Sequence, residues 1–201
     1  MELLQVLGII IVALFMLMVG PLMAGAHCDT MDGPTAKDGK KALESNNINY
    51  ALKWILPQYE DELQSIFEKC IKVRTHSSEA KEIADRFFLE SLVRFHRAGE
   101  GEPFEGLKPS GTPIDEKVAA ADKSIEIGNL SPLEGLVSSE ELHELKEKFE
   151  RVMMLKNYDQ NNVQEGREYI EAYVTFFKMA EGEEHEHAHA QSHGQSHEHG
   201  H

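Results

Sequence analysis

The sequence predicts an all-α protein, folded as a helical bundle, and three observations lead to this prediction. Apolar residues recur at i, i+3 and i+4 in nearly every segment after residue 35, which is the pattern of an amphipathic helix. No stretch alternates polar and apolar residues as a half-buried strand would. Helix starts are marked by Ser131-Pro132 and, at the spacing of a capping box, by Ser138 with Glu141 and Asn162 with Glu165.

Residues 1–26 form an apolar run that predicts a cleaved signal peptide. The run carries one charge, Glu2, and Gly20-Pro21 breaks it just before the small residues Ala24-Gly25-Ala26, which fit a signal-peptidase site. Cleavage there would make His27 the first residue of the mature protein. The alternative is an uncleaved signal anchor, because the run is close to the about 20 residues that span a bilayer and lacks a basic start.

Both readings of the leader predict an exported protein. It would be periplasmic, extracellular or anchored on the outside of a membrane, and residues 1–26 would contact the membrane only if they stay uncleaved. The net charge of −15, from 20 basic and 35 acidic residues, excludes a nucleic-acid partner, since little positive charge is left to neutralise phosphates. The same charge would raise the local concentration of cations.

Residues 27–182 are predicted to form one helical domain built by internal duplication. Shifting the sequence by 82 residues aligns a unit of about 35–98 with a unit of about 114–180. We expect each unit to contain a helix, a short broken helix and a long helical hairpin, with the two units packed as a pseudo-twofold bundle. The identical pairs at this offset include Asn47/Asn129, Leu63/Leu145, Phe67/Phe149, Phe95/Phe177 and Ala98/Ala180.

Two segments interrupt this helical pattern. The stretch 99–113 is rich in Gly and Pro and is longer than a bundle connection needs, so we expect either a functional loop or a linker. Residues 183–201 are low in complexity and predicted to be disordered without a ligand. Of the two cysteines, Cys70 continues an apolar helical stripe and is predicted to be a buried thiol, while a disulfide with Cys28 is the alternative.

The histidine tail, residues 183–201, is the strongest chemical signal in the chain. Imidazole suits Zn, Ni and Cu, and the interleaved acidic residues add negative charge. The tail should bind metal in its neutral form and release it below about pH 6, where imidazole protonates. The seven candidate ligands are His185, His187, His189, His193, His197, His199 and His201.

The predicted mature amino terminus is a second candidate metal site. Its α-amine, the His27 imidazole and the Cys28 thiolate would be adjacent, and Asp29 or Asp32 could add an oxygen ligand or orient the imidazole. His27-Cys28-Asp29, followed by Gly33, resembles the nickel-binding hook of nickel superoxide dismutases, which are helical-bundle enzymes. This resemblance implies redox metal chemistry, but Asp32 stands where the hook has its second cysteine, so one thiolate that favours Ni(III) is missing.

A broader resemblance spans residues 27–180. The stretches His27–Pro34, Leu92–Gly111 and Gly166–Phe177 are similar to a family of uncharacterised exported helical domains. The resemblance implies a helical fold and export, and no particular activity.

The third candidate site is His96-Arg97-Ala98-Gly99-Glu100. Arg97 and Glu100 at i, i+3, and Glu90 and Arg94 at i, i+4, have the spacing of helix-surface ion pairs. The functional alternative makes His96 a metal ligand or a general base beneath the Gly-rich stretch.

Three hypotheses for function follow. The first is an exported, non-enzymatic protein that buffers or delivers Ni, Cu or Zn through the histidine tail and the amino terminus. The second is a redox metalloenzyme that uses the His27-Cys28 site. The third is an envelope structural or interaction module in which the stretch 99–113 is the contact surface. Phosphate-binding loops, CxxC, GxSxG and HExxH motifs do not occur.

Overall fold

A computed structural model describes residues 27–182, which form seven α-helices and two short 3₁₀ helices and contain no β-strand. The all-α prediction is therefore confirmed. The predicted leader at 1–26 and the histidine tail lie outside the described residues. In chain order the elements are α2 (Pro34–Ser45), α3 (Asn49–Leu52), η1 (Pro57–Tyr59), α4 (Glu60–Val73), α5 (Ser78–Glu100), α6 (Glu116–Ile127), η2 (Ser131–Leu133), α7 (Ser139–Leu155) and α8 (Val163–Glu181).

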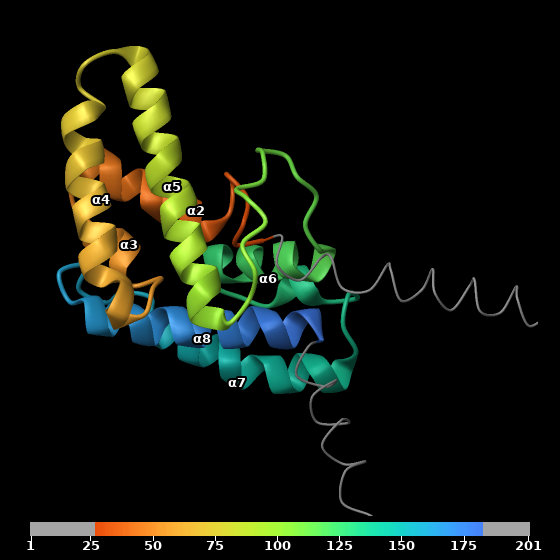
Figure 1. Ribbon diagram of the computed structural model, residues 1–201. Helices are drawn as coiled ribbons and strands as arrows, with labels where there is room; N and C mark the ends of the chain where they lie inside the picture. Colours follow the sequence, from red (N-terminus) through yellow and green to blue (C-terminus); the bar gives the residue numbers. More distant parts are fainter. Residues whose placement is uncertain (1–26, 183–201) are drawn as a thin grey trace, which may run out of the picture.

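The helices pack as two hairpins, each with a further helix against it. Helices α4 and α5 form the first hairpin and α2 lies against α5, while α7 and α8 form the second and α6 lies against α8. The α4–α5 hairpin rises away from the layer that contains α6, α7 and α8 (Figure 1). The predicted helical bundle thus has its two hairpins crossing rather than all helices running side by side.

One hydrophobic core runs through both halves of the described chain. It follows the predicted stripes, because residues spaced i, i+3 and i+4 face the same side of a helix. Each large side chain buried there stabilises the fold by about 1.5–3 kcal/mol relative to an exposed one. The largest fully buried side chains include Phe88, Phe95, Phe176, Leu63, Leu92, Leu133 and Leu145.

Helix starts lie where polar side chains accept hydrogen bonds from the first turn. Ser138 and Glu141 form the predicted capping box of α7, and Asn162 accepts hydrogen bonds from the first-turn amides of α8. Asp115 caps α6 in the same way, and Ser77 caps α5. Such caps satisfy amides that have no intrahelical partner and contribute about 1 kcal/mol each.

The chain that links α5 to α6, residues 101–115, is fastened to the amino-terminal segment, residues 27–33. The Met31 amide donates to the Lys108 carbonyl at 2.9 Å, and the Lys108 amide donates to the Asp29 carbonyl at 2.8 Å. Leu107 of this loop is buried. The Gly-rich stretch is therefore part of the packed domain, and it holds the first described residues in place.

Cys28 and Cys70 are both buried and both free, which confirms the prediction of a buried thiol at Cys70. Among residues 27–182 no helix is long and apolar enough to cross a membrane.

Candidate functional site

The amino-terminal segment is buried, not displayed at the surface. His27 is 5% exposed and Asp29 is 3% exposed. The segment turns back on itself, and the Gly33 amide donates to the Thr30 carbonyl at 3.0 Å. A Cβ atom at Gly33 would lie 2.1 Å from the His27 carbonyl oxygen, so this turn requires glycine. Gly33 is also the N-cap of α2, with Pro34 at the first helical position.

His27 lies against two polar side chains from the second half of the chain. Its Nε2 is 2.9 Å from the Tyr173 hydroxyl oxygen and 3.0 Å from Asp122 Oδ2, while the Tyr173 hydroxyl donates to Asp122 Oδ1. Because the Tyr173 hydroxyl directs its own proton at Asp122, both oxygens are left to accept from the imidazole, which places a ring proton on Nε2. We name these three residues the His27 cluster.

The His27 cluster has one apolar wall and one side that reaches solvent. The His27 ring meets Phe177 edge-on, with ring centroids 5.6 Å apart. The Asp122 side chain is 36% exposed. Burial, and then the Asp122 charge, raise the pKa of Tyr173 well above its ordinary value, so the phenol remains a hydrogen-bond donor at neutral pH.

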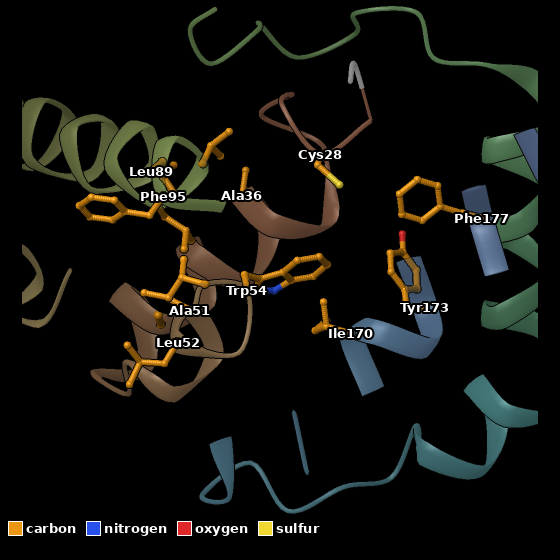
Figure 2. Packing of buried hydrophobic residues seen from close by; sticks show 14 of the residues in the cluster. Cys28, Ala36, Ala51, Leu52, Trp54, Leu89, Phe95, Ile170, Tyr173 and Phe177 are labelled. Carbon is orange, nitrogen blue, oxygen red and sulfur yellow. The ribbon is translucent and has the colours of Figure 1, made fainter. Parts of the chain in front are cut away.

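Cys28 points into the same interior, toward the region of Tyr173 and Phe177 (Figure 2). Its side chain is buried. Burial raises the pKa of the Cys28 thiol far above its usual value, and the negative charge of Glu100 raises it further. The thiol is therefore protonated at neutral pH, and a metal could use its sulfur only by displacing that proton.

A second polar cluster joins the amino-terminal segment to the end of α5, and we name it the Arg97 cluster. Arg97 Nη1 donates to Glu100 Oε2 at 2.9 Å, and Arg97 Nε lies 3.7 Å from Asp29 Oδ1. His96 Nδ1 donates to the Trp54 carbonyl at 2.9 Å, and its Nε2 lies 3.8 Å from Glu100 Oε2.

Burial controls the charges in the Arg97 cluster. It raises the pKa of Asp29 to about 6, although Arg97 opposes this shift. It also lowers the pKa of His96, so that the ring is neutral at physiological pH. Within residues 27–182, Asp29 Oδ1, Arg97 Nε and His96 Nε2 are buried without a hydrogen-bond partner.

The expected ion pairs around this cluster are only partly present. The Arg97–Glu100 pair is confirmed at 2.9 Å. The expected Glu90–Arg94 pair is wrong: Glu90 instead accepts from Arg86 at 2.8 Å, and Arg94 reaches Glu62 on α4 at 3.5 Å. Arg94 pairs with a residue on a neighbouring helix, and the spacing within one helix does not predict such a partner.

Trp54 separates the two clusters. Its ring is edge-on to His96, with centroids 5.5 Å apart, and edge-on to Tyr173 at 6.0 Å. Its Nε1 donates to Asp38 Oδ2 at 2.9 Å, and the buried Lys53 Nζ lies 2.8 Å from the same oxygen. A line of polar groups thus crosses the interior where the two halves of the chain meet.

The structure brings some predicted site residues together and leaves others apart. His27, Cys28 and Asp29 share one buried segment, while Asp32 is exposed and accepts hydrogen bonds from Ser110 Oγ at 2.6 Å and the Gly111 amide at 2.8 Å. Among the residues described, no group of three or more His, Cys, Asp or Glu side chains is placed to hold a metal ion. The predicted ligands of the tail, His185 to His201, lie outside the described residues.

Sequence reasoning missed Asp122, Tyr173, Trp54, Lys53 and Asp38. Tyr173 belongs to an apolar stripe and is read correctly as core, but nothing local indicates its hydroxyl partner 51 residues away. One signal was available at Asp122, since it is a carboxylate within the helical pattern of α6 between the buried positions Ala121 and Ser124.

A solvent-open groove of about 530 Å³ lies elsewhere, between the α2–α3 junction and α4, and is lined by Asn46, Asn47, Ile48, Gln64, Phe67, Glu68, Ile71 and Lys72. It contains none of the predicted site residues.

Comparison with known proteins gives a family and no activity. Residues 32–179 match the model of DUF6448, described as a family of unknown function. No curated protein and no solved structure matches the chain.

Proposed function

Because this chain belongs to DUF6448, a family of unknown function, its activity has to be inferred from its own residues, and we propose an exported metal-binding protein that buffers or delivers Ni, Cu or Zn. Residues 1–26 would direct export and be removed after Ala26. The histidine tail would take up the metal, and the helical domain would carry the tail and contribute a second site at its amino terminus.

The single observation that carries this proposal is the composition of the tail. Seven of its residues are histidine, from His185 to His201, and the residues between them are acidic, small or glutamine. Imidazole is the ligand that Zn, Ni and Cu share. The overall charge of −15 supports the proposal, because it favours the approach of cations.

The amino-terminal segment supports a second site in the domain. The side chains of His27, Cys28 and Asp29 are almost fully buried and lie among charged groups. A segment with a purely structural role would bury apolar residues at a lower cost in free energy. His27 carries a nitrogen donor of the kind that borderline metals prefer, and the Cys28 sulfur would join it only by losing its proton.

We also infer that the helical domain arose by duplication at an offset of 82 residues. The bounds of α2, Pro34–Ser45, shifted by 82, are those of α6, Glu116–Ile127. The last residue of α4, Val73, falls on the last residue of α7, Leu155.

Matching hydrogen bonds support the same inference. The Asn47 amide donates to the Ala42 carbonyl, and 82 residues later the Asn129 amide donates to the Ser124 carbonyl. Asn47 Oδ1 then accepts from the Asn49 amide, as Asn129 Oδ1 does from the Ser131 amide.

The candidate site departs from this internal symmetry. At the same offset His96 falls on Lys178, Asp122 on Lys40 and Tyr173 on Ser91. The polar clusters therefore belong to one copy or to the junction between copies, which is where a duplicated scaffold gains a function that its halves lack.

The test compares the mature chain, residues 27–201, with a variant in which the seven tail histidines are glutamine. Calorimetric titration with Zn²⁺ and Ni²⁺ should show several ions bound by the unmodified chain at about pH 7.5 and release at about pH 5.5, because imidazole protonates in between. The glutamine variant should keep its helical circular dichroism and lose most of the binding. Equal binding by both chains would contradict the proposal.

Export is tested separately. The full chain, expressed with residues 1–26, should be recovered outside the cytoplasm with an intact mass that begins at His27. A mass that includes residues 1–26 would mean that the exported protein is anchored in the membrane and not secreted.

A further inference from the structure

We propose that removal of the leader creates a copper(II) site at His27, in which the new α-amine and the imidazole Nδ1 chelate the metal while Asp122 and Tyr173 hold Nε2. The inference rests on the proposed cleavage and metal binding, and it assigns ligand atoms, a metal and two positioning residues that the proposed function leaves open.

The two ring nitrogens of His27 have different roles. Among the described residues, every polar contact of the His27 ring runs through Nε2, at 2.9 Å to Tyr173 and 3.0 Å to Asp122. These acceptors place a proton on Nε2, and Nδ1, which contacts no polar group of the described residues, is the nitrogen left for a metal. Nδ1 is the nitrogen nearer the backbone of its own residue.

The second step is the chelate itself. In a histidine with a free amine, the amine nitrogen, Cα, Cβ, Cγ and Nδ1 close a six-membered ring through one metal ion. Nε2 cannot take part, because it lies on the far side of the imidazole. The contacts of His27 therefore occupy the nitrogen that a chelate does not need and leave the one that it does.

The third step is the role of Asp122 and Tyr173. A metal-bound histidine commonly donates its other ring N–H to a carboxylate, which fixes the ring and makes the ligating nitrogen more basic. Asp122 has that position, and the Tyr173 hydroxyl donates to its second oxygen and so orients the carboxylate. Neither residue would touch the metal, and both are positioning residues.

Copper(II) is the metal ion that these donors favour. The donors are two nitrogens, and for nitrogen sites the affinity of divalent metals rises to a maximum at Cu²⁺. Cys28 is buried as a thiol and does not add the thiolate that would favour a softer ion.

The site has a built-in requirement for maturation. In the uncleaved chain the His27 nitrogen is an amide in the bond to Ala26, which is not an amine ligand. Metal binding at His27 would therefore begin only when the leader has been removed.

The experiment uses full-length mature chains whose seven tail histidines are glutamine, so that only the domain binds. One chain begins at His27, and its matched control begins at Pro21, which retains residues 21–26 and changes no residue of the domain. One equivalent of copper sulfate is added, and affinity and electron paramagnetic resonance are measured. The chain that begins at His27 should bind one Cu²⁺ with hyperfine coupling to two nitrogens, and the Pro21 control should not.

Two substitutions test the positioning residues. Asp122→Asn should weaken copper binding by about 10–100-fold, the usual effect of losing an outer carboxylate. Glu126→Gln removes another carboxylate of α6, one paired with Lys123 at the surface, and should leave binding unchanged. Thermal unfolding of each apo variant, and the nitrogen coupling of its copper form, separate a weakened site from a damaged fold.

The failures are distinguishable. Equal copper binding by the chains that begin at His27 and Pro21 would overturn the chelate. Absence of copper from the His27 chain would overturn it too, while metal on the unmodified tail would still support the proposed function.

Discussion

Asp29 is a carboxylic acid held where its ionised form is disfavoured. Its side chain is 4% exposed, and the nearest cation, Arg97 Nε, is 3.7 Å from Oδ1 while Arg97 Nη1 is committed to Glu100. Burial raises the pKa of Asp29 to about 6 from its ordinary value of 3.8. The folded protein therefore keeps a proton that the unfolded chain releases between these two pH values.

We expect this proton to appear in the pH dependence of stability. Since the folded state binds the extra proton, the contribution of Asp29 to the free energy of unfolding is greatest below about pH 4 and falls as the pH rises to about 6. Asp29→Asn should remove that slope, so that the difference between variant and wild type in urea unfolding changes across this window and is flat above about pH 7. A constant difference from pH 4 to 7 would show that Asp29 titrates normally.

Gly33 is the residue on which the shape of the amino-terminal turn depends. Gly33→Ala would place a methyl group 2.1 Å from the His27 carbonyl oxygen, a backbone atom that cannot move alone. We expect a loss of about 1–3 kcal/mol, the usual cost of overpacking, measured by chemical denaturation. Gly99→Ala is the control, because the atom nearest to the added Cβ is Leu56 Cγ at 3.2 Å. This atom belongs to a side chain, which can move to make room. A smaller loss at Gly33 than at Gly99 would contradict this account.

At the scale of elements, local pattern was sufficient to predict the helices. Whether a segment is helical depends on residues three or four apart and on a cap next to its first turn, as at Ser138 and Asn162. The polar clusters depend on other distances. His27 and Tyr173 are 146 residues apart, and which side chains meet across such a separation is decided by how whole helices pack.

The sequence therefore predicted only those residues of the candidate site that lie close together along the chain. His27, Cys28 and Asp29 stand out because they are adjacent and chemically distinctive, and His96, Arg97 and Glu100 because they share a helix face. Among their partners, only Asp122 of α6 carries a local signal, a carboxylate within a helical pattern, and those on α8 and the α3–η1 connection carry none. The burial of the amino-terminal segment was also not foreseen, since it follows from its pairing with the loop at Lys108.

The proposed duplication can be tested at the element scale with two equivalent cations. Arg74 Nη1 donates to the Leu43 carbonyl at 2.9 Å, and 82 residues later Lys156 Nζ donates to the Ile125 carbonyl at 2.6 Å. Each cation thus fastens the C-terminal end of one hairpin helix to the helix that lies against that hairpin. Arg74 also binds both oxygens of Asp85, at 2.7 and 2.9 Å.

We expect Arg74→Met and Lys156→Met to destabilise the protein by the same mechanism and to different extents. Loss of the Lys156 bond should cost about 1 kcal/mol, and loss of the Arg74 network about 2–3 kcal/mol, because Asp85 then keeps only the exposed Lys81 as its partner. Urea denaturation gives both values. No loss at Lys156 would mean that the two contacts are not equivalent parts of the fold.

At the scale of the whole molecule, polar contacts join the two halves of the described chain. Arg167 of α8 donates to the Leu52 and Ile55 carbonyls at 3.3 Å each and to Glu60. The Lys53 ammonium donates to the Tyr158 hydroxyl, and the His27 cluster adds a further junction. Breaking any of these buried or half-buried pairs leaves a charge or carbonyl unsatisfied.

We therefore expect the two halves to unfold together. Trp54, the one tryptophan of the chain, reports on the first half by fluorescence. Met154 of α7 is 73% exposed, so that Met154→Cys gives a label site in the second half, while Cys28 and Cys70 are buried and protected from the reagent. Coincident denaturation curves from the two probes are the mark of a two-state transition.

Arg167→Met extends this test, because it removes contacts between the halves and replaces neither probe. If the junction makes the molecule cooperative, the variant should lower the midpoints of both probes equally, by an amount corresponding to about 1–3 kcal/mol. Separate midpoints in the wild-type chain would contradict this prediction, since each hairpin unit would then be stable alone. A single transition would instead mean that the His27 cluster forms only when both halves fold, which ties the proposed amino-terminal site to the intact domain.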